Sequence, residues 1–441
     1  MADEKGRISR FLSAIGSPFK RKESPTPSMP LWTSGIQEPV MAQGITIPAL
    51  YAVSNESLIL RTVLAKLRQE MFRRGYYWEK KFQFCCESCG EEYSDSVDAC
   101  KLCGSPVREP DVEQMLYPKW LLKQENSMEQ SFLHILYEIE NDLNIVDDAY
   151  LILVKEYYLD NNGEIRMHRI KEIYRGDPVT MAIYSDEVGE RGTKGFTSLN
   201  DRNFLAEDQH ECHPETNESL HPVHYVNRAK GEEQYFIEGE VLHFSKYSPS
   251  RLYGQSPVLT LFSHITTLLA MEQYVNTSYT KSRMPRGLLA VQTRNMESMR
   301  TFWRSVKEKM EEDKHFIPIM GIEADNGKGS VEWIKFMDSL KEMDYVAVKE
   351  DLRDRIAAFY GVSKIFMADN SASGGLNNEG MQILVTNRAV EMAQNVYNLY
   401  VFPWLAEEFG ITDWKLVLPP SEEEDEIAVM RKREIEVNIA A

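Results

Sequence analysis

Cysteines are the residues best suited to do chemistry, and five of the six lie between Cys85 and Cys103. Four of these five form two Cys-x-x-Cys-Gly units, in which a tight turn directs two thiolates toward one ion and the glycine allows the backbone to close. Four sulfurs complete a tetrahedral shell with no open position, so we expect one structural Zn²⁺ per chain. The expected ligands are Cys86, Cys89, Cys100 and Cys103.

Two alternatives to this zinc site remain open. Cys85 could replace Cys86, although the Cys-x-x-Cys spacing favours Cys86. Two disulfides would suit a secreted protein, whereas the first thirty residues lack the apolar core of a secretion signal. The insert, roughly residues 82–108, is too small to bury a core, so metal binding is expected to supply most of its folding free energy.

A second group of metal-binding residue types is less regular in its spacing. It consists of His210, Cys212, His213, His221 and His224. Because acidic residues are interspersed throughout this stretch, we interpret it as a polar surface loop and keep a second metal site as the alternative.

No enzyme motif has the spacing that its chemistry requires. Five residues separate Gly321 from Gly327-Lys328, where a phosphate-binding loop needs four, and the Ser or Thr that holds magnesium is missing. Gly254-Gln-Ser256 lacks the second glycine of a nucleophile elbow. We interpret the acidic pair Asp147-Asp148 and the run 422–426 as solvated faces. The sequence therefore predicts no catalytic residue and no enzyme activity.

The composition is that of a folded, acidic protein. The chain has 441 residues, with 50 Lys and Arg against 68 Asp and Glu, which gives a net charge of −18. A hydrophobic content of 43% is enough to exclude wholesale disorder, and the length indicates roughly three domains. No run of 18 apolar residues occurs, so no membrane-spanning helix is expected. Net acidity argues against a protein that coats DNA, because Lys and Arg supply affinity for phosphate.

The elements that must carry these residues are mixed in the first half of the chain. Residues 1–50 are rich in Pro, Ser and Gly, include Lys20-Arg21-Lys22, and are predicted to form a mobile arm. Ser54 is predicted to cap a helix that ends at Gly75, and a second helix follows at 127–145. Alternating patterns predict a hairpin of 149–158 with 164–174, then strands at 178–184, 223–227, 234–238 and 240–245. This order indicates an α+β fold.

The second half of the chain is dominated by long helices. Pro257 opens a helix of about 25 residues, and a second long helix spans roughly 338–360. Between them we expect strands at 287–292 and 331–336 and a helix at 296–313. A Gly- and Asn-containing loop, 366–378, precedes a last long helix, 379–409, which should kink or break at Pro403. A strand at 414–418 and an acidic tail at 421–441 complete the chain.

Three motifs, in this order, carry a resemblance to a known family. They are Tyr253-Gly254-Gln-Ser256-Pro257 before the first long helix, Ile356-Ala-Ala-Phe359-Tyr-Gly361-Val362 at the end of the second, and Gly374-Gly375-Leu-Asn377-Asn378-Glu379 before the last. With the elements between them, they make residues 50–420 resemble the portal proteins of tailed bacteriophages.

The resemblance implies a portal-like subunit with a defined domain plan. Residues 1–50 would be a flexible arm, 51–255 a mixed wing that holds the zinc module at 82–108, and 256–284 and 338–361 two stem helices. The clip would be 285–337, a small α/β unit. The tunnel loop would be 362–378, followed by the helix and strand of the wing at 379–419 and by the start of a short crown at 420–441.

The same resemblance implies function and partners. The chain would assemble in the host cytoplasm into a homo-oligomeric ring of about twelve subunits at one capsid vertex of the virion. Double-stranded DNA would be packaged and ejected through the ring without sequence recognition. The clip would dock the terminase large subunit and later the head–tail adaptor, and the zinc module, which is not general in the family, would face the major capsid or scaffold protein. No membrane partner is implied. The tunnel-loop residues toward DNA would be Asp369, Asn370, Ser371, Ser373, Gly374, Gly375, Asn377 and Asn378.

Two alternatives of other classes remain. A zinc-ribbon enzyme that processes nucleic acid would need nuclease residues and a basic stripe, neither of which the sequence displays. The other alternative is a non-portal structural protein of a virion or of another macromolecular ring, which particle imaging would distinguish from a portal.

Overall fold

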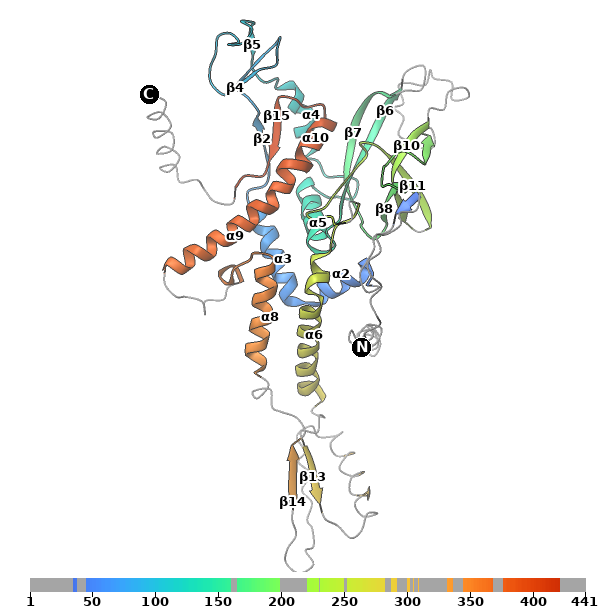
Figure 1. Ribbon diagram of the computed structural model, residues 1–441, viewed down its shortest axis with the longest axis vertical. Coiled ribbons are helices and arrows are strands. Elements are labelled where there is room, and N and C mark those ends of the chain that lie inside the picture. The colour runs from blue at the N-terminus through green and yellow to red at the C-terminus, as the bar shows by residue number, and fades with distance from the viewer. Residues whose placement is uncertain are drawn as a thin grey trace, which may run out of the picture.

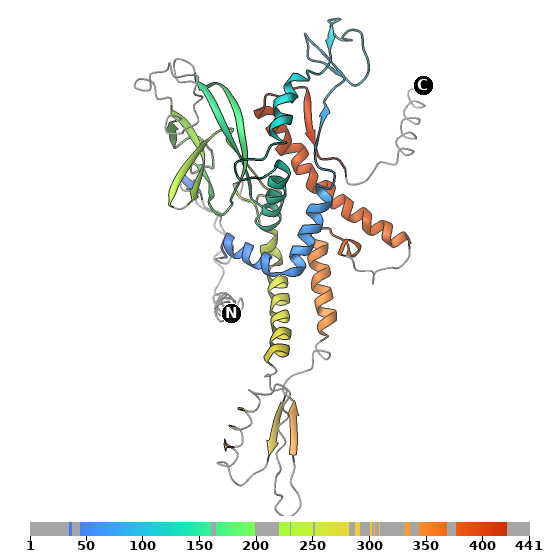
Figure 2. The same ribbon diagram turned by 180° about the vertical axis from the view of Figure 1, so that it is seen from behind.

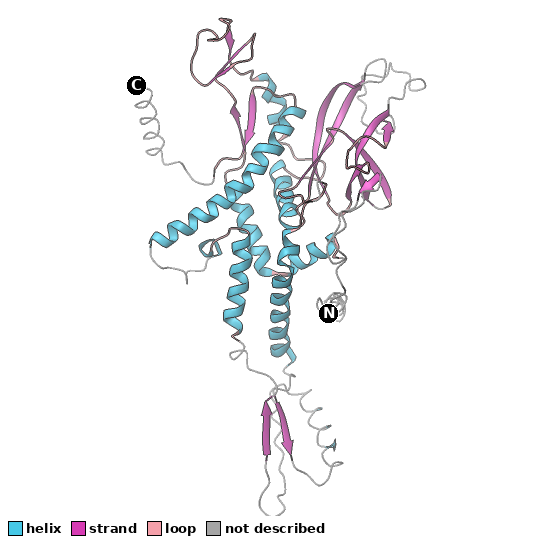
Figure 3. Ribbon diagram, viewed as in Figure 1, coloured by secondary structure: helices cyan, strands magenta, loops and turns pink. Residues whose placement is uncertain are grey.

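The structure is a computed structural model that describes most of the chain. The described residues are 35–37, 45–159, 165–198, 220–229, 231–249, 252–281, 287–291, 300–301, 304, 308, 331–335, 344–367 and 376–420. A helical body occupies the centre, with two β-sheets beside it, two antiparallel helices below it and a small β-module, residues 84–108, above it (Figures 1 and 3). The α+β composition expected from the sequence is confirmed.

Two helices, α2 (Ile47–Glu56) and α3 (Leu58–Met71), begin the body. The prediction of a single helix capped by Ser54 is wrong at its start. Ser57 caps α3 by accepting a hydrogen bond from the Leu60 backbone N–H (3.4 Å), and Ser54 is buried inside α2. Helix α3 ends at Met71, four residues before the predicted stop, and the turn that follows leads to Gly75, whose φ of 67° is one that glycine tolerates best.

Helix α5 (Phe132–Ile145) lies at the middle of the body. It starts at the cap Ser131, later than the predicted 127. Its apolar face joins a core that includes residues from almost every helix, among them Leu50, Leu64, Leu136, Ile356 and Phe402. The short helix α4 (Glu113–Leu121), which contains Pro118, was not predicted.

Two antiparallel sheets stand beside α5. One pairs β12 (Val241–Phe244) with the hairpin β6 (Ala149–Leu159) and β7 (Ile165–Gly176), as the alternating pattern predicted. The other has the order β1 (Gly35–Gln37), β8 (Met181–Ser185), β10 (Leu220–Ala229), β11 (Glu232–Ile237), with β9 (Phe196–Ser198) against β10.

Helices α6 (Pro257–Lys281) and α8 (Tyr345–Phe359) run side by side below the body in both views (Figures 1 and 2). An ion pair between Lys349 and Glu272, 3.0 Å, joins them. Beyond their lower ends, β13 (Gly287–Val291) pairs antiparallel with β14 (Val331–Lys335), so both predicted strands are present. Most of the helix predicted at 296–313 lies outside the described residues.

The last helical segment is interrupted as Pro403 led us to expect. Helix α9 (Leu376–Val396) passes into a π-helical turn, η6 (Tyr397–Val401), and then into α10 (Phe402–Glu408), with Pro403 at its start. Helix α9 begins three residues before the predicted 379. Strand β15 (Trp414–Val417) then pairs with β2 (Tyr77–Lys80). Among the described residues, no helix combines the length and apolar character needed to cross a membrane.

Candidate functional site: a four-cysteine metal centre

The small module at the top of Figure 1, residues 84–108, consists of three short strands and two cysteine turns. Strand β3 (Phe84–Cys86) lies between β4 (Glu92–Tyr93) and β5 (Val107–Arg108). The two turns are built alike: the Gly90 N–H donates to the Cys86 carbonyl (3.1 Å), and the Gly104 N–H donates to the Cys100 carbonyl (2.9 Å). Both glycines adopt positive φ, 71° and 72°, which explains why glycine follows each Cys-x-x-Cys unit.

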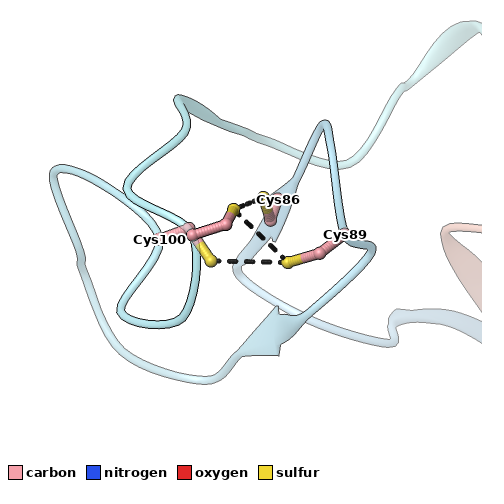
Figure 4. Close-up of side chains that lie close together, drawn as sticks. Cys86, Cys89 and Cys100 are labelled. Carbon is pink, nitrogen blue, oxygen red and sulfur yellow. Dashed lines mark hydrogen bonds between the residues drawn. The ribbon is translucent and has the colours of Figure 1, made fainter.

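The turns bring four sulfurs together (Figure 4). The Sγ–Sγ distances are 3.4 Å for Cys86–Cys103, 3.5 Å for Cys89–Cys100 and 3.6 Å for Cys89–Cys103. All four Sγ atoms lie within 4.8 Å of one another. A tetrahedron with Zn–S bonds of about 2.3 Å has edges of about 3.8 Å, so the sulfur arrangement fits a tetrahedral metal ion. The four cysteines can therefore hold a metal.

Neighbouring groups favour the thiolate that a metal requires at two of the four cysteines, whereas hydrogen bonds to Cys86 and Cys100 raise the pKa of Cys89 to about 12. The Tyr93 hydroxyl, 3.3 Å from Cys100 Sγ, lowers the pKa of that thiol to about 6. Hydrogen bonds from Ser105 lower the pKa of Cys103. Cys85 is buried outside this cluster, with its Sγ 3.7 Å from the Cys86 carbonyl oxygen. The structure thus brings together the four predicted ligands and leaves Cys85 apart.

One residue of the body, Asp413, binds both ends of the module. The side chain of Asp413 accepts hydrogen bonds from Arg108, with 3.0 Å between Nη2 and Oδ1, and from the Asp111 N–H at 2.9 Å. Its backbone carbonyl accepts from the Lys81 N–H at 3.0 Å. The Arg108 guanidinium lowers the pKa of Asp413 to about 2. The module is therefore attached to the loop before β15 at its first and last residues.

The other predicted site residues are only partly described. Asp369, Asn370, Ser371, Ser373, Gly374 and Gly375 lie outside the described residues, and Asn377 and Asn378 lie in the first turn of α9. Of the histidine group, His210, Cys212 and His213 also lie outside, whereas His221 and His224 lie on β10. Among the residues that the structure covers, the four cysteines form the only such cluster of possible metal ligands.

The interpretation of Asp147-Asp148 as a solvated face is wrong, because both side chains are buried. They form the turn after α5, where Asp147 has a φ of 64°. Asp147 accepts from the Lys246 and Tyr247 N–H groups at 2.8 and 3.0 Å. The sequence contains no local sign of this role, since the bonding partners lie about a hundred residues away.

Two of the motifs that carried the resemblance meet at this turn. Asp148 accepts from the Gly254 N–H at 2.8 Å, and a Cβ on Gly254 would lie 1.9 Å from the Asp147 carbonyl oxygen. Ser256 donates to the Ile145 carbonyl (2.5 Å) and accepts from the Leu259 N–H, so it both caps α6 and fixes it to α5. Tyr360, at the end of α8, donates to the Asn144 carbonyl at 2.8 Å. Both long helices are thus bound to the end of α5.

Comparisons with known proteins give a family match. A family model described as "Phage portal protein" matches residues 117–390. The neck of an empty gene transfer agent particle, computed with C6 symmetry, is similar at 14% identity and a TM-score of 0.48 over 90% of each chain. The native particle neck, computed with C12 symmetry, is similar at 14% identity and 0.46 over 92% of each chain. An HK97 family phage portal protein from Corynebacterium diphtheriae is similar at 12% identity and 0.38, covering 86% of this chain and 97% of that one. The curated proteins contain no match.

Proposed function

This chain belongs to the phage portal protein family, and from that premise we propose how its parts serve a portal ring at a capsid vertex through which double-stranded DNA is packaged and ejected. The observation that carries the proposal is the extent of the family match. Residues 117–390 include α5, both long helices, the strands between them and most of α9. The match therefore covers the parts that would form the channel. Portal proteins are structural, and the proposal gives the chain no catalytic role.

The stem and clip are assigned from the helix pair. In the proposed ring of about twelve subunits, α6 and α8 would stand beside the same helices of the neighbouring subunits. The β13–β14 pair, at the far end of these helices, would belong to the clip. The clip would dock the terminase large subunit during packaging and the head–tail adaptor afterwards. The bonds of Ser256 and Tyr360 to the end of α5 would keep stem and wing at a set angle.

The tunnel loop is proposed to face the DNA. Residues 362–378 contain one basic residue, Lys364, which pairs with Asp354 at 2.6 Å. The predicted contact residues between 369 and 378 include no Lys or Arg. Short polar groups without positive charge can touch the phosphate backbone without adding the salt-dependent attraction that basic residues supply. This composition suits DNA that must slide.

We propose that the four cysteines bind Zn²⁺. Zinc prefers four sulfur ligands in a closed tetrahedron, and such a site is structural because no coordination position is left for a substrate. In the ring the module would project from the wing toward the capsid or scaffold protein. Its role would be to present a rigid surface there, since a metal can fold a segment too small to form its own core.

Electron microscopy of the purified full-length protein tests the ring. We expect closed rings of about twelve subunits with a central channel wide enough for a DNA duplex, which is about 20 Å across. Native mass measurement should give the same subunit number. A protein that stays monomeric at the concentrations of assembly, or that forms open filaments, would contradict the proposal.

A further inference from the structure

Helix α9 and the π-helical turn η6 that continues it expose apolar side chains on one face. Met381, Val385, Met392 and Leu399 are 60%, 51%, 74% and 64% exposed. The first half of α9 extends away from the body (Figures 1 and 2), and the short helix η4 (Lys364–Met367) contacts its inner side, where Ser363 bonds to Thr386. The described part of the chain therefore leaves more than half of each of these four side chains exposed.

The exposed positions follow a heptad spacing. Successive steps of four and three residues connect six exposed positions, which we call the outer stripe: Met381, Val385, Arg388, Met392, Asn395 and Leu399. At 3.6 residues per turn the five positions in α9 fall within a sector of about 80°, and Leu399 follows them in η6. The opposite face is buried in the core and includes Val390 and Ala393 of α9 and Tyr397 and Val401 of η6. Helix α9 thus packs one apolar face against the body of its own chain and exposes a second apolar face to solvent.

The outer stripe has the features of a helix-packing surface. Its part in α9, from Met381 to Asn395, is about 21 Å long at 1.5 Å per residue. An apolar stripe with this spacing packs against another helix by inserting side chains between those of its partner. Polar residues at single positions of such a stripe, here Arg388 and Asn395, set the register of the pair. Exposed apolar side chains that are grouped on one face mark sites of protein–protein contact.

We propose that the outer stripe of α9 packs against the neighbouring copy of this chain and forms part of the contact between subunits. This inference rests on the proposed ring. In a ring each subunit presents one surface to the next subunit and receives a different one, so a projecting helix with an apolar face has a partner in every subunit. DNA is a poor occupant, because phosphate contacts need polar or basic groups. A neighbouring copy covers the stripe from assembly onward, whereas an adaptor that arrives after packaging leaves it exposed until then.

Photo-crosslinking identifies the occupant directly. Met392 is replaced by benzoylphenylalanine in the full-length protein, and Leu102 at the tip of the metal module, 73% exposed, is replaced as the matched control. After irradiation, rings that carry benzoylphenylalanine at position 392 should give covalent species at multiples of the chain mass. Mapping of the crosslinked peptides should join residue 392 to a second chain. The Leu102 rings should give at least tenfold less dimer. Crosslinks from residue 392 that stay within one chain, for example to 421–441, would overturn the proposal, as would equal dimer yields from both positions.

A charge in the stripe supplies an independent test. Met392→Glu should lower the fraction of chains in rings at least tenfold, while circular dichroism of the monomer stays as in the wild type, because Met392 is exposed in the single chain. Leu102→Glu adds the same charge and should assemble normally. If the wild-type protein forms no rings, the proposed function fails. If Met392→Glu forms rings as well as the wild type does, the outer stripe alone is wrongly assigned.

Discussion

Cys85 and Cys86 are consecutive residues of β3, and only Cys86 points its sulfur at the other three cysteines. Because side chains on a strand alternate between its two faces, a shift of one residue would direct Cys85 into the cluster instead. The Gly90 N–H donates to the Cys86 carbonyl and closes the turn. This turn determines which of the two cysteines points toward the metal site. These neighbours therefore form a natural matched pair for mutation.

The zinc proposal predicts different outcomes for the two cysteines. Elemental analysis of the wild-type protein should find about one zinc per chain. Cys86→Ser removes one of four thiolates and should lower zinc affinity at least 100-fold, so that the purified protein has little zinc. Cys85→Ser should retain the wild-type content. Equal losses in the two variants, or a wild-type protein without zinc, would contradict the assignment.

Asp147 makes stability depend on pH. Burial raises its pKa to about 6, above the usual 3.8 of an unfolded chain. The folded state then binds the proton more tightly, so the stabilising contribution is complete below about pH 4 and is lost as pH rises through about 6. Asp147→Asn cannot titrate. The melting temperature of this variant minus that of the wild type should therefore increase between pH 4 and pH 7. The increase corresponds to a gain of no more than about 3 kcal/mol in unfolding free energy relative to the wild type. A difference that is constant across this range would show that Asp147 does not titrate there.

Residues with local signals were predicted well, and residues with distant partners were not. The spacing of the cysteines and the glycine after each pair are local, so the cluster could be read directly. Asp147 and Asp148 look like ordinary surface acids in the sequence. They are buried because the segment 243–254 returns to the end of α5 and supplies backbone donors. Nothing near residue 147 in the sequence indicates that return.

At the scale of elements, long periodic segments were the most predictable. The hairpin β6–β7 and helix α6 lie within a few residues of their expected bounds. Short or irregular elements were missed or misplaced. Helix α4 contains Pro118 and lacks a regular apolar stripe on its buried side. The start of α3 was shifted because Ser54 and Ser57 both suit a cap, and only packing of α2 against the core decides for Ser57.

The tunnel-loop assignment is tested by restricting the backbone of that loop. Proline at both Gly374 and Gly375 fixes φ and removes two N–H groups, whereas glycine adapts freely. We expect the double proline variant to form rings in normal number but to package DNA at least tenfold less well, measured as nuclease-protected DNA per particle. A double alanine variant should package less DNA than the wild type and more than the double proline variant. Normal DNA filling in the proline variant would refute the assignment.

At the scale of the whole molecule, the net charge of −18 is compatible with a DNA channel. A protein that holds DNA needs basic surfaces, and each neutralised phosphate adds attraction that resists movement. A channel that lets DNA pass is better served by walls that attract it weakly or repel it. Net acidity therefore excludes tight coating of DNA but not transport of DNA. The estimate of three separate domains is better replaced by one subunit, because a single core cluster joins helices from residues 47 to 405.

The binding of Lys81, Arg108 and Asp111 to the single residue Asp413 has a consequence for how such proteins diversify. The chain leaves the body and returns to it at one point, so the module is a peripheral insertion. Its removal would require only a short linker between β2 and α4. A lineage could gain, lose or exchange it in one genetic step without disturbing the channel. By the same reasoning, this junction is a favourable place to graft an affinity tag or a fluorescent domain onto the assembled particle.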